Sequence, residues 1–166
     1  MSVELAEFNL SEERLEFRDT LRRFFEEQAS IAEVRRVMEE EGTGYSAALW
    51  QNAAEELGLA GIAIAEEQGG QGFGLKELGI ALGEVGRHLA PIPLLASAGL
   101  AGRVVQHVGG ADAAPRLTAI AEGAAATLAW VEAGGDWDPA ATALEVAGDG
   151  DEIRPVSYTH LRAHET

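Results

Sequence analysis

The stretch from Leu57 to Pro93 constrains the fold of this chain more than any other part of the sequence. It joins the end of one expected helix, a short apolar run, a glycine-rich loop and an amphipathic helix. The loop holds four glycines within six residues, at positions 69, 70, 72 and 74. Glycine lets a backbone turn tightly or approach another group closely. The loop is therefore expected to be either a plain tight loop or the shaped wall of a pocket.

A loop that cradles phosphate is a third interpretation, and the neighbouring residues argue against it. The loop does not match the pattern G-x-x-x-x-G-K-[ST], and no strand–glycine–helix unit of the nucleotide-binding type surrounds it. The apolar run that precedes it, Leu59 to Ala65, is too short and too interrupted by glycine for a globular helix. This run is predicted to be buried extended chain.

Apolar periodicity predicts helices on both sides of this run. Ser11 can cap the first helix, and its aromatic face is expected to point into the core. That face carries Phe17, Leu21, Phe24 and Gln28, with Phe25 beside it. Gly58 stands where a left-handed residue would end the third helix. The expected helices cover about 11–28, 32–40, 46–57, 75–89, 94–108 and 112–122.

The helix expected over 75–89 combines a leucine-rich face with internal glycines. The residues predicted to point inward are Leu75, Leu78, Leu82, Val85 and Leu89. The glycines among them are Gly79, Gly83 and Gly86. Each glycine costs a helix roughly 1 kcal/mol relative to alanine. Three of them suggest that another helix or a ligand comes close to this backbone.

From about residue 125 the period of the sequence changes to that of strands. Thr127 to Glu132 has a strand pattern, and Thr142 to Val146 is a possible second strand. Gly148 to Asp151 is typical of a hairpin turn. The fold class is therefore predicted to be mainly α, with a helical domain over 1–124 and the truncated start of a β domain over 125–155.

The last eleven residues, 156–166, differ from the alanine- and glycine-rich chain before them. One codon reading of VSYTHLRAHET looks like the transposon adapter used in sequencing-library preparation. This segment is interpreted as adapter read-through rather than native protein. His160 and His164 are consequently not candidate metal ligands, and the native protein is expected to continue past Arg154.

Composition excludes several classes of partner. The formal net charge is -16, so the chain lacks the clustered basic residues that nucleic acid or an anionic membrane surface would require. It contains no cysteine, and its acidic N-terminus does not resemble a signal peptide. These features are consistent with a cytoplasmic location.

The residues by themselves indicate no catalytic constellation. His88 and His107 have neither triad nor metal-binding spacing, and both are expected near the surface at helix ends. Glu66 and Glu67 flank the glycine loop, where a plain loop charge is the simpler interpretation. Glu84 lies within the glycine-containing helix, and it is expected either to face a pocket or to serve a surface or capping role.

Several motifs, in their order and spacing, resemble the N-terminal part of the acyl-CoA dehydrogenases. Residues 50–61, WQNAAEELGLAG, look like the family's W-x-x-x-A-E-L-G-x-x-G segment. Residues 66–72, EEQGGQG, are similar to its P-E-x-x-G-G-x-G loop, with Ala65 in place of the proline. Residues 84–87 match the E-E-x-G/A helix that follows, and LSEE at 10–13 looks like the family's first helix. The resemblance covers about Leu10 to Asp138.

This resemblance implies an orthogonal helical bundle, a middle β domain and a C-terminal helical bundle, of which the last would be missing here. It implies FAD as cofactor and α,β-dehydrogenation of an acyl-CoA thioester in fatty-acid or steroid side-chain degradation. It further implies electron-transfer flavoprotein as electron acceptor. The family's base carboxylate lies in the C-terminal domain, so no catalytic residue is assigned and the fragment itself is expected to be inactive.

The resemblance also implies site residues. The expected cofactor-binding residues are Leu128, Trp130, Val131 and Glu132. Val131 replaces the family's threonine, and residues 134–137, GGDW, lack the serine of its G-x-G-S segment. Backbone hydrogen bonds to flavin would survive these changes, whereas the hydroxyl contacts would not. The expected substrate-lining residues are Glu84, Pro91, Pro93, Leu94 and Ser97.

These departures leave alternatives open. One is a non-catalytic partner subunit of a heteromeric acyl-CoA dehydrogenase. The segment Leu89 to Leu95 resembles the branch of the family that pairs two different subunits. Another is a helical interaction module without enzyme activity. A homo- or hetero-oligomer with acyl-CoA dehydrogenase subunits is expected both for an active subunit and for a non-catalytic partner subunit. A base carboxylate beyond Arg154 would favour the active subunit, and a natural stop codon there would favour the module.

Overall fold

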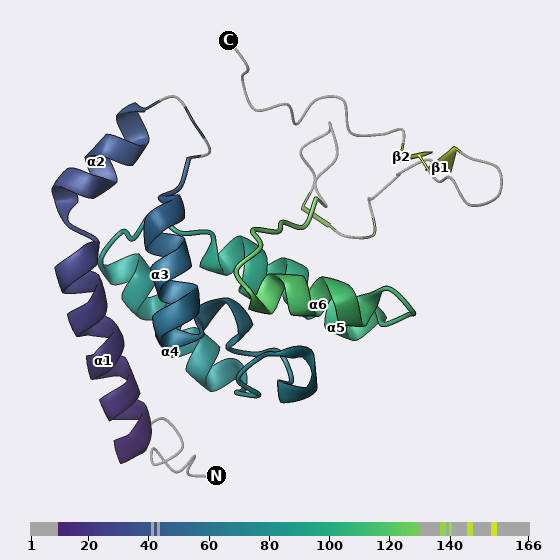
Figure 1. Ribbon diagram of the computed structural model, residues 1–166, viewed down its shortest axis with the longest axis horizontal. Coiled ribbons are helices and arrows are strands. Elements are labelled where there is room, and N and C mark those ends of the chain that lie inside the picture. The colour runs from purple at the N-terminus through teal and green to yellow at the C-terminus, as the bar shows by residue number, and fades with distance from the viewer. Residues whose placement is uncertain are drawn as a thin grey trace. The chain divides into compact units, whose positions relative to one another are not determined.

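The computed structural model describes residues 10–40, 42, 44–129, 137–138 and 140, and the backbone of two short strands. The chain divides into two compact units, Met1–Leu128 and Ala129–Thr166, which are described separately. The first unit is helical (Figure 1). The prediction of a mainly α fold is confirmed.

Six α-helices form the first unit, as far as the structure describes it. They are α1 (Glu12–Gln28), α2 (Ile31–Glu39), α3 (Ala47–Leu57), α4 (Leu75–Arg87), α5 (Gly102–Val108) and α6 (Ala113–Ala121). Shorter turns connect them, namely the 3-10 turns η2 (Leu59–Gly61) and η3 (Glu66–Gln68) and the π-helical turn η4 (Leu95–Ala101), which runs directly into α5. None of the helices among the described residues is long and apolar enough to cross a membrane.

Serine side chains begin the first three helices. Ser11, Ser30 and Ser46 each have an extended backbone, and each hydroxyl accepts a hydrogen bond from the amide three residues later. Such a cap satisfies an amide that has no partner within the helix. Gly58 ends α3 with a φ of 63°, as its position in the sequence predicted.

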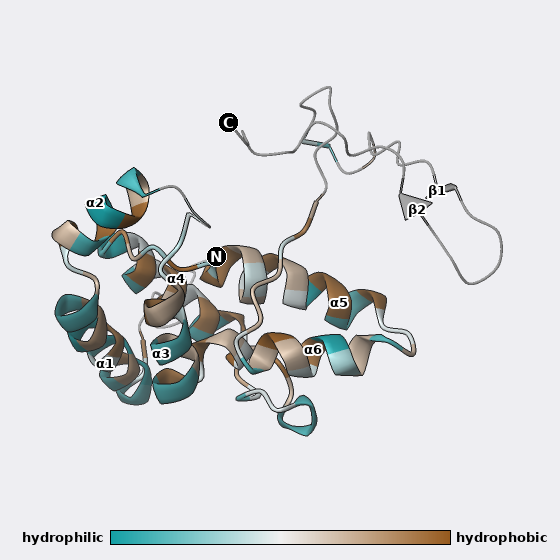
Figure 2. Ribbon diagram, turned by 45° about the horizontal axis from the view of Figure 1, so that its top comes forward, coloured by the Kyte–Doolittle hydropathy of each residue, from teal (hydrophilic) through white to brown (hydrophobic). Residues whose placement is uncertain are grey.

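The core of the unit lies between α1, α3, α4 and η4. Phe25, Leu21, Leu59, Ile62 and Leu94 are its largest fully buried apolar side chains. Figure 2 shows hydrophobic residues of α1 turned toward α3 and α4, which confirms the predicted aromatic face. A smaller cluster of Ile64, Leu117 and Ile120 lies where α5 and α6 run side by side.

Two sequence predictions within this unit were wrong. The run 59–65 is buried as expected, but it forms η2 and a further turn rather than extended chain. Leu75 and Leu89 are both 63% exposed, although they were expected to point inward. Leu89 lies beyond the end of α4 and has a φ of 51°, so it does not continue the apolar face of that helix.

In the second unit the structure describes one pair of short antiparallel strands. β1 (Val146–Ala147) pairs with β2 (Arg154–Pro155), with Val146 opposite Pro155. Residues 127–129 of the first predicted strand belong to no strand, and residues 130–132 lie outside the described residues. The predicted hairpin turn at 148–151 and the tail 156–166 also lie outside them.

Candidate functional site

The glycine-rich loop is a tight turn that packs on the rest of its own chain. The amides of Gln71, Gly72 and Phe73 donate to the carbonyls of Gly61, Ile64 and Ile62 at 2.8–3.0 Å. The amides of 68–70 donate within η3, and the amide of 74 donates to Glu77. Every amide from 68 to 74 therefore has a partner within the chain. A phosphate would have to displace these bonds, so the loop offers no anion cradle.

Close approach explains the glycine at position 70. A side chain there would overlap the carbonyl oxygen and the side chain of Ile64. The glycines within α4 differ, because a Cβ atom at Gly79, Gly83 or Gly86 would have no neighbour within 4 Å. The sequence predicted that another group comes close to the backbone of α4 at these glycines. No described residue of this chain does so.

Glu84 is buried, so the predicted surface role was wrong. Its side chain is 7% exposed, and both carboxylate oxygens accept hydrogen bonds from Arg22 of α1, at 2.8 and 3.3 Å. The same hydrogen bonds raise the pKa of Arg22. The carbonyl oxygen of Glu84 lies 2.8 Å from Nδ1 of His88. This expected substrate-lining carboxylate is therefore engaged between α1 and α4.

The histidines occupy different environments. His88 directly follows α4, at a helix end as expected, and its side chain is partly buried beside Phe25, with 12% exposed. His107 is exposed in the last turn of α5, as expected. Glu66 and Glu67 are exposed loop charges. No group of three or more potential metal ligands lies among the residues that the structure describes.

The remaining expected substrate-lining residues lie together in the connection between α4 and η4. The Pro91 carbonyl accepts a hydrogen bond from the Ser46 amide at 2.8 Å, and the Pro93 carbonyl accepts one from the Ser97 amide at 2.8 Å. Leu94 and Ser97 are completely buried. These bonds hold the connection between α4 and η4 to the start of α3 and to η4 itself.

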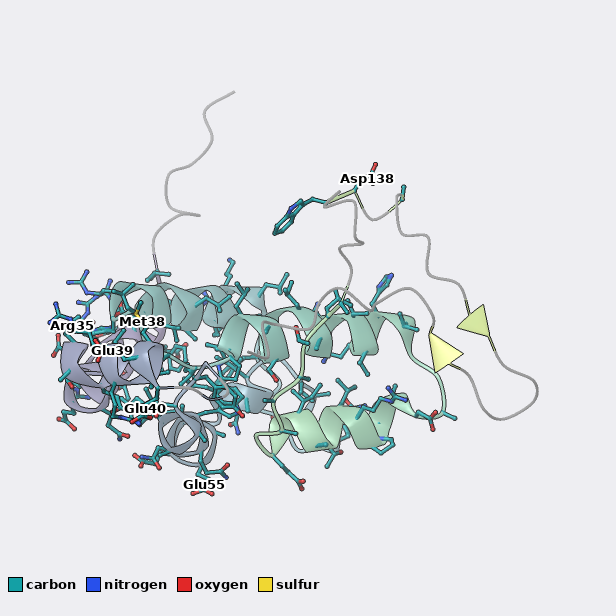
Figure 3. The ribbon with its side chains drawn as sticks, turned by 90° about the horizontal axis from the view of Figure 1, so that it is seen from above. Arg35, Met38, Glu39, Glu40, Glu55 and Asp138 are labelled. Carbon is teal, nitrogen blue, oxygen red and sulfur yellow. The ribbon has the colours of Figure 1, made fainter. Side chains whose placement is uncertain are left out.

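Pro91 also lines an open groove of about 650 Å³ between α2 and the end of α4. Its apolar lining residues are Val34, Val37, Met38, Val85, Leu89 and Ala90. Met38 is 80% exposed and lies near Arg35 and Glu39 on α2 (Figure 3). The groove is a surface feature of the helical unit.

The hydroxyl of Ser97 hydrogen-bonds to the exit segment, residues 123–126, through which the chain leaves the helical unit. It donates to the carbonyl of Ala124 and accepts from the amide of Ala126, both at 3.2 Å. Two residues later, Leu128 is half-buried, and Thr127 to Ala129 make no hydrogen bond within the described part of the chain. The structure thus joins the expected substrate-lining segment to the start of the expected cofactor-binding segment. Trp130, Val131 and Glu132 lie outside the described residues.

Sequence reasoning missed a second contact with this exit segment. The indole Nε1 of Trp50 donates to the carbonyl of Gly123 at 2.7 Å, and Trp50 is 2% exposed. A buried indole N–H needs an acceptor. The buried indole of Trp50 therefore requires a polar partner, although the position of that partner along the chain could not be read from the sequence.

A model of the acyl-CoA dehydrogenase N-terminal domain family matches residues 11–124. The chain belongs to this family. Among curated relatives, the acyl-CoA dehydrogenase IpdE2 of Mycolicibacterium smegmatis is 42% identical over 86 residues, 52% of this chain and 27% of the relative. IpdE2 of Mycobacterium tuberculosis is 39% identical over 84 residues, 51% of this chain and 26% of the relative.

Two solved structures share the fold. The Tcur3481-Tcur3483 steroid ACAD, solved as a variant, aligns with a TM-score of 0.75 and 32% identity over 87% of this chain and 39% of that one. The ChsE4-ChsE5 complex of Mycobacterium tuberculosis aligns with a TM-score of 0.75 and 22% identity over 89% of this chain and 39% of that one. The chain matches about a quarter of the length of these two curated relatives.

Proposed function

We propose that this chain is the N-terminal part of an FAD-dependent acyl-CoA dehydrogenase subunit that oxidises the Cα–Cβ bond of an acyl-CoA thioester. The observation that carries the proposal is the contact of Ser97 with residues 124 and 126. This contact joins the proposed acyl-lining segment, 91–97, to the chain that leads into the proposed flavin-binding segment, 128–132. A dehydrogenase needs both segments next to the reacting carbons.

The described residues are compatible with FAD that is held by hydrogen bonds to backbone amides and carbonyls. Thr127 and Leu128 offer amides and carbonyls without partners in the described part of the chain, and a flavin ring can use such groups. We propose that Leu128, Trp130, Val131 and Glu132 hold the flavin. When bound, FAD supplies the hydride acceptor for the oxidation. No residue of this chain is assigned as the base that removes the α-proton.

We propose a bulky acyl group, such as a steroid side-chain thioester, as the substrate. The proposed acyl-lining segment carries Pro91, Pro93, Leu94 and Ser97, and its residues 96, 98 and 99 are alanine or glycine. Leu94 and Ser97 are buried in this unit, so the partly exposed wall consists of Pro91, Pro93 and the small residues 96 and 99. Small side chains leave room for a wide substrate. One structural neighbour is a steroid ACAD, which supports this substrate class. Glu84 would take part only at the edge of this wall, since Arg22 holds both of its oxygens.

A second candidate is a non-catalytic subunit that pairs with an active one. Two observations favour it, namely Val131 in place of the family's threonine and the missing serine in residues 134–137. The neighbour from Mycobacterium tuberculosis is named as a complex of two proteins. Under either candidate we propose an oligomer with other acyl-CoA dehydrogenase subunits, a cytoplasmic location and, for the active form, electron-transfer flavoprotein as acceptor.

The test begins with sequencing the gene past the codon for Arg154 and producing the complete subunit. The active-subunit proposal expects a yellow protein with stoichiometric FAD that oxidises acyl-CoA thioesters in the presence of an electron acceptor. A complete subunit that is colourless and lacks a base carboxylate would favour the partner role, which copurification with a second subunit would then test.

A matched pair of variants addresses the flavin segment directly. Val131→Thr restores the family's hydroxyl and should strengthen FAD binding up to about tenfold, the value of one net hydrogen bond. Val146→Thr makes the same chemical change outside the segment and should leave the FAD dissociation constant unaltered. Equal effects of the two variants would remove Val131 from the flavin site.

A further inference from the structure

Two buried polar side chains hold the polypeptide where it leaves the helical unit. Trp50 of α3 donates to the carbonyl of Gly123 at 2.7 Å. Ser97 of η4 bridges the carbonyl of Ala124 and the amide of Ala126. Three of the polar backbone groups in four consecutive residues are therefore satisfied by side chains from two other elements.

The π-helical turn presents Ser97 to this segment. In η4 the amide of Gly102 donates to the carbonyl of Ser97, five residues earlier, so the turn is one residue wider than an α-helical turn. Ser97 is completely buried within it, and among the described residues its hydroxyl hydrogen-bonds only to the exit segment. Such wide turns occur frequently at functional sites.

The end of α6 explains why the exit segment needs these anchors. The amides of Gly123 and Ala124 donate back to Ile120 and Ala119, and Gly123 has a φ of 99°. The chain thus turns away from α6 and passes η4. Among the described residues, the backbone from Ala124 to Leu128 makes three hydrogen bonds. The Ala124 amide donates to Ala119, and the other two bonds are those with the Ser97 hydroxyl. Loss of the hydroxyl would leave a part-buried carbonyl and amide without partners.

We propose that Trp50 and Ser97 are positioning residues that fix the path and register of the flavin-binding segment. The inference rests on the proposed function, and it assigns Ser97 a role different from that of a substrate-lining hydroxyl. Ala126 lies only two residues before Leu128, so a shift of the anchored segment is carried into residues 128–132.

The test compares Ser97→Ala with Ser46→Ala. Ser46 is a matched control because it is also buried and its hydroxyl also makes two hydrogen bonds, to Glu33 and to the amide of Leu49. It does not contact the exit segment. Trp50→Phe removes the second anchor while it keeps an aromatic ring, and Ser97→Thr retains the hydroxyl.

The first readout is amide hydrogen exchange in the 166-residue chain. Ser97→Ala should accelerate exchange at the Ala126 amide by about tenfold or more, since that amide loses its hydrogen bond to the Ser97 hydroxyl. Ser46→Ala should leave the Ala126 amide unchanged at equal loss of thermal stability. Equal protection of Ala126 in wild type and Ser97→Ala would overturn the anchoring role.

The second readout is the FAD dissociation constant of the complete subunit, measured by flavin fluorescence. Ser97→Ala and Trp50→Phe should each weaken binding by about tenfold, Ser97→Thr should restore it, and Ser46→Ala should not change it. Unchanged binding in Ser97→Ala, together with faster exchange, would overturn the positioning role alone. A wild-type subunit that binds no FAD would overturn the proposed function, whereas the exchange result would still report on the anchor.

Discussion

The glycines of the loop and the glycines of α4 lie within twenty residues of each other but serve different physical purposes. In the loop, Gly70 touches Ile64 so closely that no side chain can be accommodated, and Gly69 has a φ of 80°. In α4, the space beside Gly79, Gly83 and Gly86 is empty among the described residues. Gly70 is thus explained by a contact within the unit and Gly69 by its backbone conformation, while the glycines of α4 reduce helix stability without a compensating contact among the described residues.

The largest expected effect is that of Gly70→Ala. The new methyl group would overlap the Ile64 carbonyl, so backbone must move, and we expect the free energy of unfolding to fall by about 3 kcal/mol. Urea unfolding followed by circular dichroism measures it. A loss below that of Gly69→Ala would show that the loop relaxes easily and that close approach does not explain Gly70.

Gly69→Ala separates backbone conformation from steric overlap. Its φ of 80° is unfavourable for alanine, but no atom lies within 4 Å of the new Cβ. We expect a loss of about 1 kcal/mol, the cost of a left-handed alanine. The same urea titration applies. No measurable loss would mean that the η3 turn adopts another conformation at this residue.

Gly83→Ala should have the opposite sign in the 166-residue chain. Its Cβ would enter open space within an α-helix, so we expect a gain of about 1 kcal/mol in stability. Lys76→Ala, at an exposed position of the same helix, is the control and should be nearly neutral. If Gly83→Ala destabilises the complete subunit while it stabilises this chain, another part of the protein packs against α4.

The smallest effect is expected at the surface of α2, where no glycine is involved. Hydrogen bonds from Arg36 and then from Ser46 lower the pKa of Glu33 from 4.5 to about 2. The charged form is favoured in the folded state, so its stabilising contribution is present above pH 4.5 and is lost as the pH falls toward 2. Glu33→Gln should therefore show a shallower loss of stability over this range. Melting temperatures that decrease equally with pH for wild type and Glu33→Gln would contradict the lowered pKa of Glu33.

Local signals in the sequence predicted where the helices lie, although the first half of the helix expected over 94–108 is the π-helical turn η4. Ser11 and Gly58 stand at the helix ends that their chemistry predicted, because a cap and the backbone group it satisfies lie within a few residues of each other. The aromatic face of α1 was predicted for the same reason, since its members are neighbours on one helix. The short apolar run 59–65 was predicted to be buried, but its conformation was not, because such runs do not distinguish turn from extended chain.

The sequence by itself determined the helical class, the helix ends and, through its motifs, the family. Only the tertiary structure decided that Glu84 pairs with Arg22, that the loop amides bind their own chain and that Ser97 and Trp50 hold residues 123–126. The partners in these contacts lie on different elements, 62 residues apart for the ion pair and 73 for the indole. A sequence pattern reports which residues are near each other along one element, whereas packing between elements selects the partner of each buried polar group.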